Sequence, residues 1–191
     1  MSQKDYLRKY NWVWFSLGYV NSALLSLDAI LREEDIPEEK MDVVWMPPSS
    51  VEDVPIVIFY NIRHAIELVI KTTGVYKGTA PVLVHDIKRL LPALETEYPG
   101  KSKTIEQFVN LTKKYYGTDF YKDNFGAVLP DDPKNILFRY PENKAMINHI
   151  DPAIIGRVHK KLAREIKRDV EQLRVAIYRF HGELAGDKLI Y

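Results

Sequence analysis

Near the C-terminus, an arginine and a histidine have a spacing that suits phosphate chemistry. Arg174 and His181 are seven residues apart in a segment with helical periodicity. Seven residues turn an α-helix through about 700°, so both side chains lie on one side of the helix, about two turns apart. Arginine can hold a phosphate through its planar guanidinium group, and histidine can transfer a proton near neutral pH. Cleavage of RNA without a metal ion needs both functions.

Tyr178 lies between these two residues and can donate a hydrogen bond to a phosphate oxygen. A simpler interpretation is also open. Glu171 precedes Arg174 by three residues, so an ordinary surface ion pair would explain the arginine. A single histidine near the end of a helix is often solvated rather than catalytic. The spacing alone therefore fits both a catalytic site and a solvated helix face.

A second group of charged residues follows helical spacing within residues 54–73. Arg63, Glu67 and Lys71 form one stripe opposite the apolar face, and His64 borders it. We interpret Arg63, His64 and Glu67 as candidate residues for binding RNA or a nucleotide. The alternative is a ladder of ion pairs with Lys71 on the polar side of the helix.

The third candidate region consists of residues 117–150 and the residue before them. We predict that residues 117–150 form a long irregular segment. Aromatic rings interleaved with cations can stack on unpaired bases, and Arg139 is the candidate RNA-binding cation here. The alternative is that the aromatic rings pack against the helices and hold the long loop in place. The aromatic residues are Tyr116, Phe120, Tyr121, Phe125, Phe138 and Tyr140.

Hydrophobic periodicity predicts the helices that must position these groups. The expected helices cover residues 5–34, 54–73, 85–98, 104–116 and 151–185. Gly74 is expected to end the second helix, Asp151 to cap the last, and Gly18 to let a neighbouring helix approach the first. Because strand-like alternation is missing, the predicted fold class is all-α. We expect an antiparallel up-and-down bundle of about five helices, with a long loop before the last.

Length, charge and composition limit the possible functions. A chain of 191 residues fits one domain, 1–191, and its formal net charge of +1 means that any RNA contact must be local. The absence of cysteine excludes disulfides, thiolate zinc sites and cysteine nucleophiles. No metal-binding or Gly-rich phosphate motif is present, so we expect neither metal nor cofactor. Residues 11–31 are apolar, but interspersed Asn and Ser favour a buried helix in a cytoplasmic protein without membrane contact.

Two stretches of the sequence resemble the HEPN family (higher eukaryotes and prokaryotes nucleotide-binding domain). The first is FYNIRHAIELVIKTTGVYKGTAPVLVHDIKRLLPAL, where a Glu-x-x-x-Lys helix, Glu67 to Lys71, leads to a His-Asp start at His85. The second is LFRYPEN, which is similar to a loop before the family's final helix. Arg174 and His181 also fit the pattern of its ribonucleases, an arginine and a histidine separated by four to six residues.

The resemblance implies a metal-independent endoribonuclease that acts as a homodimer, as in toxin–antitoxin systems. Arg174 and His181 from two protomers would meet across a twofold interface. Arg174 would then hold the phosphate, His181 would act as the acid or base, and Tyr178 would assist. The alternative is a non-catalytic module that binds a nucleotide or a partner protein such as a nucleotidyltransferase. Burial of His181 in the core would favour that alternative.

Overall fold

The structure is a computed structural model that describes residues 3–32, 54–76, 85–97, 103–126 and 158–185. Within these ranges there are helices and no strand, so the predicted all-α fold class is confirmed for the described part of the chain. The helices are α1 (Gln3–Arg32), α2 (Val54–Tyr76), α3 (Ile87–Glu97), α4 (Lys103–Tyr116), α5 (Asp119–Phe125) and α6 (Lys160–Ala185).

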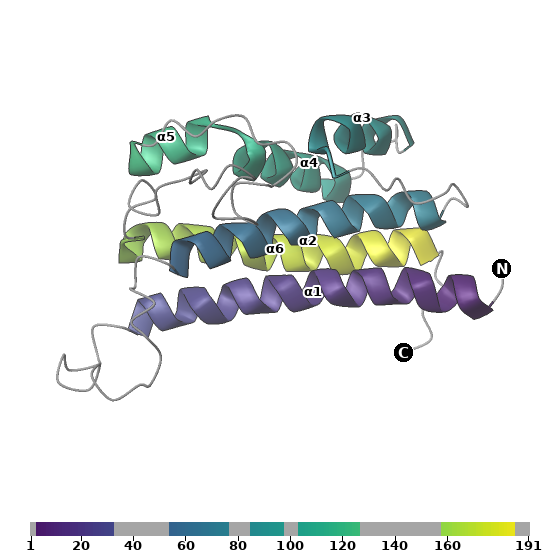
Figure 1. The fold of residues 1–191 in the computed structure, drawn as a ribbon, viewed down its shortest axis with the longest axis horizontal. Coiled ribbons are helices and arrows are strands. Elements are labelled where there is room, and N and C mark those ends of the chain that lie inside the picture. Colours follow the sequence, from purple (N-terminus) through teal and green to yellow (C-terminus); the bar gives the residue numbers. More distant parts are fainter. Residues whose placement is uncertain (1–2, 33–53, 77–84, 98–102, 127–157, 186–191) are drawn as a thin grey trace, which may run out of the picture.

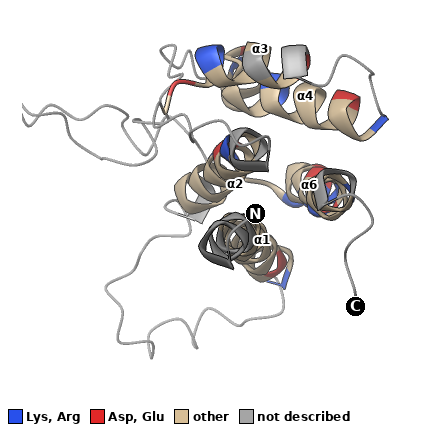
Figure 2. Cartoon of the chain, turned by 90° about the vertical axis from the view of Figure 1, so that its right-hand side faces the viewer, with Lys and Arg blue, Asp and Glu red and all other residues tan. Residues whose placement is uncertain are grey.

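The helices are arranged in three layers (Figures 1 and 2). α1 lies on one side of α2 and α6, and α4 covers their other side, with α3 and α5 in the same outer layer. The four long helices alternate in direction in the order α1, α2, α4 and α6. This is the up-and-down arrangement that the apolar periodicity predicted.

The core lies between these layers and is built from aliphatic side chains at helical spacing. Val20 and Leu27 of α1, Ile62 of α2 and Ile166 of α6 are fully buried. Burial of each such side chain stabilises the fold by about 1.5–3 kcal/mol. Because α6 buries one side between α1 and α4, its opposite side must face solvent.

The short helix α5 lies within the segment that the sequence predicted to be irregular. Phe120 and Tyr121 are buried against Phe59 of α2. Their ring centroids lie 5.8 and 5.3 Å, respectively, from the ring centroid of Phe59. Gly126 ends α5 with φ of 64°, a left-handed conformation that a residue without Cβ adopts easily. The rings of Phe120 and Tyr121 therefore hold the segment against the bundle. Because both rings are buried, RNA bases cannot stack on them.

The predicted start of the last helix is wrong. α6 begins at Lys160, and the residue before it provides the cap: the backbone N–H of Leu162 donates to His159 Nδ1 at 3.2 Å. The backbone N–H of Ala163 donates to the carbonyl of His159 at 2.9 Å. Imidazole is an uncommon capping group, so the Asp-Pro pair at residue 151 was the stronger sequence signal. Asp151 itself lies outside the described residues.

Two glycines do not have the roles that the sequence predicted. α2 continues through Gly74, so this residue does not end the helix. Gly18 is exposed, and a Cβ atom added there would meet no atom within 4 Å, so no neighbouring helix requires a glycine at this position. The core seam of α1 runs along another side, through Val13, Leu17 and Val20.

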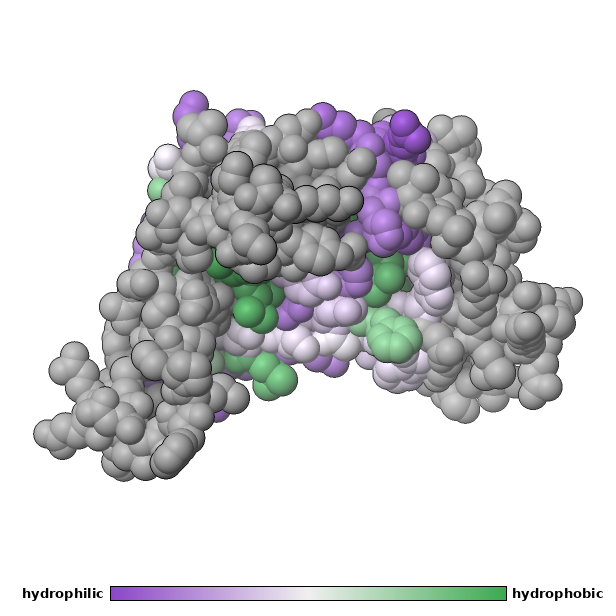
Figure 3. All heavy atoms as spheres, in the orientation of Figure 1, coloured by the Kyte–Doolittle hydropathy of each residue, from purple (hydrophilic) through white to green (hydrophobic). Residues whose placement is uncertain are grey.

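α1 contains a stretch, Trp12–Arg32, that is long and apolar enough to cross a membrane by length and composition. Core helices of soluble proteins can satisfy the same criterion. One side of α1 packs against α2 and α6, whereas Trp14, Phe15 and Leu25 are exposed. Figure 3 shows apolar side chains at the surface of the molecule among more polar neighbours.

Candidate functional site

The solvent-facing side of α6 carries a row of cations. The exposed charged residues of this helix are Lys161, Arg164, Arg168, Arg174, Arg179 and a single carboxylate, Glu171, among the described side chains. Their positions fall within about 140° of the helix circumference and extend along about 27 Å of its axis. A chain with almost no net charge therefore has a strongly positive local surface.

Polar contacts on two sides of α6 fix its rotation so that this row faces outward. On the α1 side, Lys167 Nζ lies 2.8 Å from Asp28 Oδ1. On the α4 side, Asp169 Oδ2 accepts hydrogen bonds from Tyr115 Oη at 2.8 Å and from Lys114 Nζ at 2.5 Å. Burial, together with the charge of Asp169, raises the pKa of Tyr115 well above its usual value, so the phenol remains a donor.

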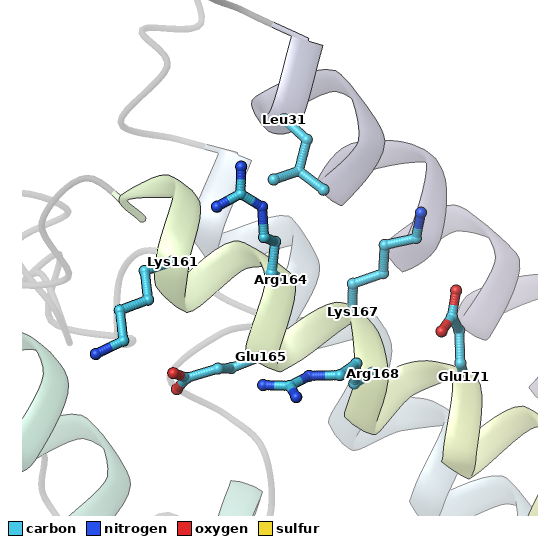
Figure 4. Close-up of a pocket in the computed structure, with 7 residues that line it drawn as sticks. All are labelled: Leu31, Lys161, Arg164, Glu165, Lys167, Arg168 and Glu171. Carbon is cyan, nitrogen blue, oxygen red and sulfur yellow. The ribbon is translucent and has the colours of Figure 1, made fainter.

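A shallow hollow of about 560 Å³ lies along the first half of α6 (Figure 4). Arg164 and Lys167 extend toward α1, where Leu31 closes one side of the hollow. The other lining residues are Lys161, Glu165, Arg168 and Glu171. A second hollow, of about 370 Å³, lies between α6 and α4 and shares Arg168 and Glu171 with the first. Basic side chains thus border two adjacent depressions in which a phosphate strand can lie.

The candidate catalytic residues of α6 have different environments. Arg174 is exposed and Tyr178 is 53% exposed, but His181 is only 9% exposed. Burial removes water from the imidazole and lowers the pKa of His181 below its usual value. His181 is therefore neutral at pH 7, so it can accept a proton but adds no positive charge for a phosphate. Its burial favours the binding-module alternative over the nuclease.

The charged stripe of α2 is buried, contrary to the expectation of a polar helix side. Arg63 is 2% exposed, Glu67 is 0% exposed and Lys71 is 5% exposed. α3 and α4 pack on α2, and Tyr116 of α4 lies 4.3 Å from the Arg63 guanidinium and donates a hydrogen bond to the Arg63 carbonyl at 2.9 Å. A ligand in solvent cannot reach the side chains of Arg63 and Glu67 in this arrangement.

Glu67 is the centre of a polar cluster that joins α2 to the residue before α3. Its Oε1 lies 2.5 Å from Lys71 Nζ and 2.6 Å from His85 Nδ1. Its Oε2 is buried without a hydrogen-bond partner, and His64 Nδ1 lies 3.9 Å from it. His85 is 49% exposed, so one edge of its ring reaches solvent. The sequence interpretation had paired Glu67 with Lys71 but had not placed His85 beside them.

The backbone next to His85 is held by a helix cap. Asp86 Oδ1 accepts a hydrogen bond from the backbone N–H of Lys88 at 3.0 Å. The Asp86 carbonyl accepts the N–H groups of Arg89 and Leu90 at 3.0 and 3.1 Å. This is the geometry of an N-cap residue, and it fixes where the chain enters α3.

His64 differs from the other α2 candidates because its ring is partly accessible. It stacks on Tyr60 with centroids 5.4 Å apart and meets Tyr19 edge-on at 4.5 Å. A hollow of about 220 Å³ beside it is also lined by Trp12, Phe15 and Leu68. Arg139, the remaining candidate, lies outside the described residues.

A scan against protein-family models, a search of curated proteins and a search of solved structures each found no match to this chain. The resemblance carried by the sequence motifs thus stays an expectation.

Proposed function

We propose that this protein binds single-stranded RNA through the exposed side of α6. The observation that carries the proposal is the row of five cations with one carboxylate among them, described above. Phosphate contacts by Arg and Lys supply most of the affinity of proteins for nucleic acids, and a row about 27 Å long spans several phosphates. The motif resemblance favours RNA as the polyanion.

Cleavage of the bound RNA without a metal ion is the second candidate function. It is favoured by Arg174 and Tyr178, which are exposed on one side of α6; His181, buried on the same helix, would have to reach the RNA to accept the proton of a 2′-hydroxyl. Arg174 would stabilise the charge on the phosphate, and the product would carry a 2′,3′-cyclic phosphate. Each chain supplies one such histidine on α6, so we propose a homodimer that combines two copies.

RNA binding is tested by fluorescence anisotropy with a labelled single-stranded RNA at several salt concentrations. Replacing both Arg164 and Arg168 with Gln should raise Kd at least tenfold at low salt. The slope of log K against log salt should fall by about 0.7 for each phosphate that the variant no longer binds. Lys122→Gln, at an exposed position of α5, is the matched control and should bind like the wild type. An unchanged Kd in the double variant would contradict the proposal.

A further inference from the structure

The hollow between α6 and α4 differs from the rest of the exposed side of α6 in the chemistry of its lining. Cations make up most of the row along α6, whereas the wall of this hollow also contains amides, a carboxylate and an apolar side chain. The lining residues are Gln107 of α4 and Arg168, Glu171, Gln172, Val175 and Arg179 of α6. Groups that can hold a phosphate are therefore mixed here with groups that can recognise another part of a nucleotide.

The five α6 residues of this hollow form one stripe along the helix. Their positions fall within about 100° of the helix circumference. Arg168 and Arg179 are the two ends of the stripe and lie about 16 Å apart along the helix axis. Glu171, Gln172 and Val175 lie between them. Two guanidinium groups at this separation can bind different phosphates of one strand, which places the nucleotide between those phosphates beside the middle of the stripe.

The middle of the stripe offers an apolar surface for the face of an unpaired base and polar groups for its edge. Val175 is 44% exposed, so a flat ring can lie against it. Gln172 is exposed and Gln107 is half-buried, and each amide carries a donor beside an acceptor. Adenine carries the complementary pair, an amino group beside a ring nitrogen. The carboxylate of Glu171 can only accept hydrogen bonds, so it favours an amino group over the carbonyl oxygens of uracil.

We propose that the hollow between α6 and α4 is a subsite that binds one unpaired adenine of the RNA, with Gln107 and Gln172 recognising the edge of the base. The amino group of the adenine donates to an amide Oε1 or to the Glu171 carboxylate, and a ring nitrogen accepts from an amide Nε2. Arg168 and Arg179 bind the phosphates on either side. The subsite rests on the proposed RNA-binding function, and it is continuous with the basic row because Arg168 belongs to both.

The base preference is tested by fluorescence anisotropy with labelled oligoadenylate and oligouridylate of equal length in the same buffer. The wild type should bind oligoadenylate at least fivefold more tightly, because a well-formed amide pair with adenine discriminates by about that factor or more. An oligomer of purine ribonucleotides keeps the ring system but lacks the amino group, so it should lose most of this advantage. Equal Kd values for the three oligomers would overturn the subsite.

The recognising residues are tested by the double variant Gln107→Ala with Gln172→Ala. It should bind oligoadenylate as weakly as oligouridylate, while Kd for oligouridylate and the slope of log K against log salt stay those of the wild type, because amides neutralise no phosphate. Asn110→Ala is the matched control: it removes an exposed amide of α4 that does not line the hollow, and it should keep the preference. A preference that survives in the double variant would overturn the role of the two glutamines.

The carboxylate gives a test in the opposite direction. Glu171→Gln removes a negative charge from the strand's path, so it should tighten binding to both oligomers, and more for oligouridylate than for oligoadenylate. An equal gain for both would contradict contact between Glu171 and the base. Failure of the subsite and failure of the proposed function look different: equal, salt-dependent binding of both oligomers overturns the subsite alone, whereas a wild type that binds neither oligomer overturns both.

Discussion

The exposed side of α6 and the cluster around Glu67 use the same kinds of charged side chain in opposite environments. On α6 the cations face water and border open hollows, so each is available to a ligand and contributes little to folding. Around Glu67 the charged groups are excluded from water, so each needs the polar or oppositely charged groups beside it to be stable in the folded protein. The difference separates two uses of charge: exposed cations can provide affinity, and buried ones can fix the direction of a neighbouring group.

The largest expected effect comes from breaking the buried pair. Glu67→Ala leaves Lys71 inside the protein without its counter-charge, and should lower the free energy of unfolding by about 3–5 kcal/mol. Urea denaturation followed by circular dichroism measures the change. The double variant Glu67→Leu with Lys71→Met should recover most of the stability, because matched apolar side chains need no partner. A decrease below about 1 kcal/mol in the single variant would mean that the cluster is open to water.

An intermediate effect is expected from His181, which lies at the edge of the core on the same helix as the exposed row. Its folded-state pKa is lowered by burial, so the unfolded chain binds a proton more readily below about pH 6.5. The free energy of unfolding should therefore fall as pH drops from about 7 to about 5, and no such contribution should exist above about pH 7. In His181→Gln this part of the decrease should vanish. Identical pH dependence in both proteins, measured by urea denaturation, would show that the imidazole is solvated.

The smallest effect is expected at the ion pair between Asp28 and Lys167, at the border of the exposed side. Lys167 Nζ and Asp28 Oδ1 are 2.8 Å apart, but both side chains remain about one-third exposed. The pair raises the pKa of Lys167. Asp28→Asn should change the free energy of unfolding by no more than about 1 kcal/mol, and by less in high salt. A change as large as that of Glu67→Ala would remove the distinction between the two regions.

The fold was largely predictable because its helices are long and their apolar positions repeat at a constant period. Val13, Leu17 and Val20 specify the core side of α1 without reference to any other element. The helix α5 was missed because its stability depends on Phe59, about sixty residues earlier in the chain. No local pattern contains that contact.

The candidate sites were predicted less well, for a related reason. Charges at helical spacing indicate an exposed stripe, and nothing near Arg63 and Glu67 in the sequence shows that α3 and α4 cover them. The contact between Glu67 and His85 spans eighteen residues, and the motif resemblance was its only signal. Periodicity predicts which side of a helix a residue occupies, but the packing of later elements decides whether water reaches it.

The imidazole cap of α6 has a consequence for how this helix begins. His159 Nδ1 can accept the Leu162 N–H only while the nitrogen has a free lone pair, and protonation would remove that acceptor. The protonated ring would also place positive charge at the positive end of the helix dipole. Loss of this acceptor should therefore loosen the first turn of α6, which carries Lys161. Amide exchange of that turn should be faster, relative to the rest of α6, in His159→Ala than in the wild type, which would make the first residues of the basic row the least firmly held part of the helix.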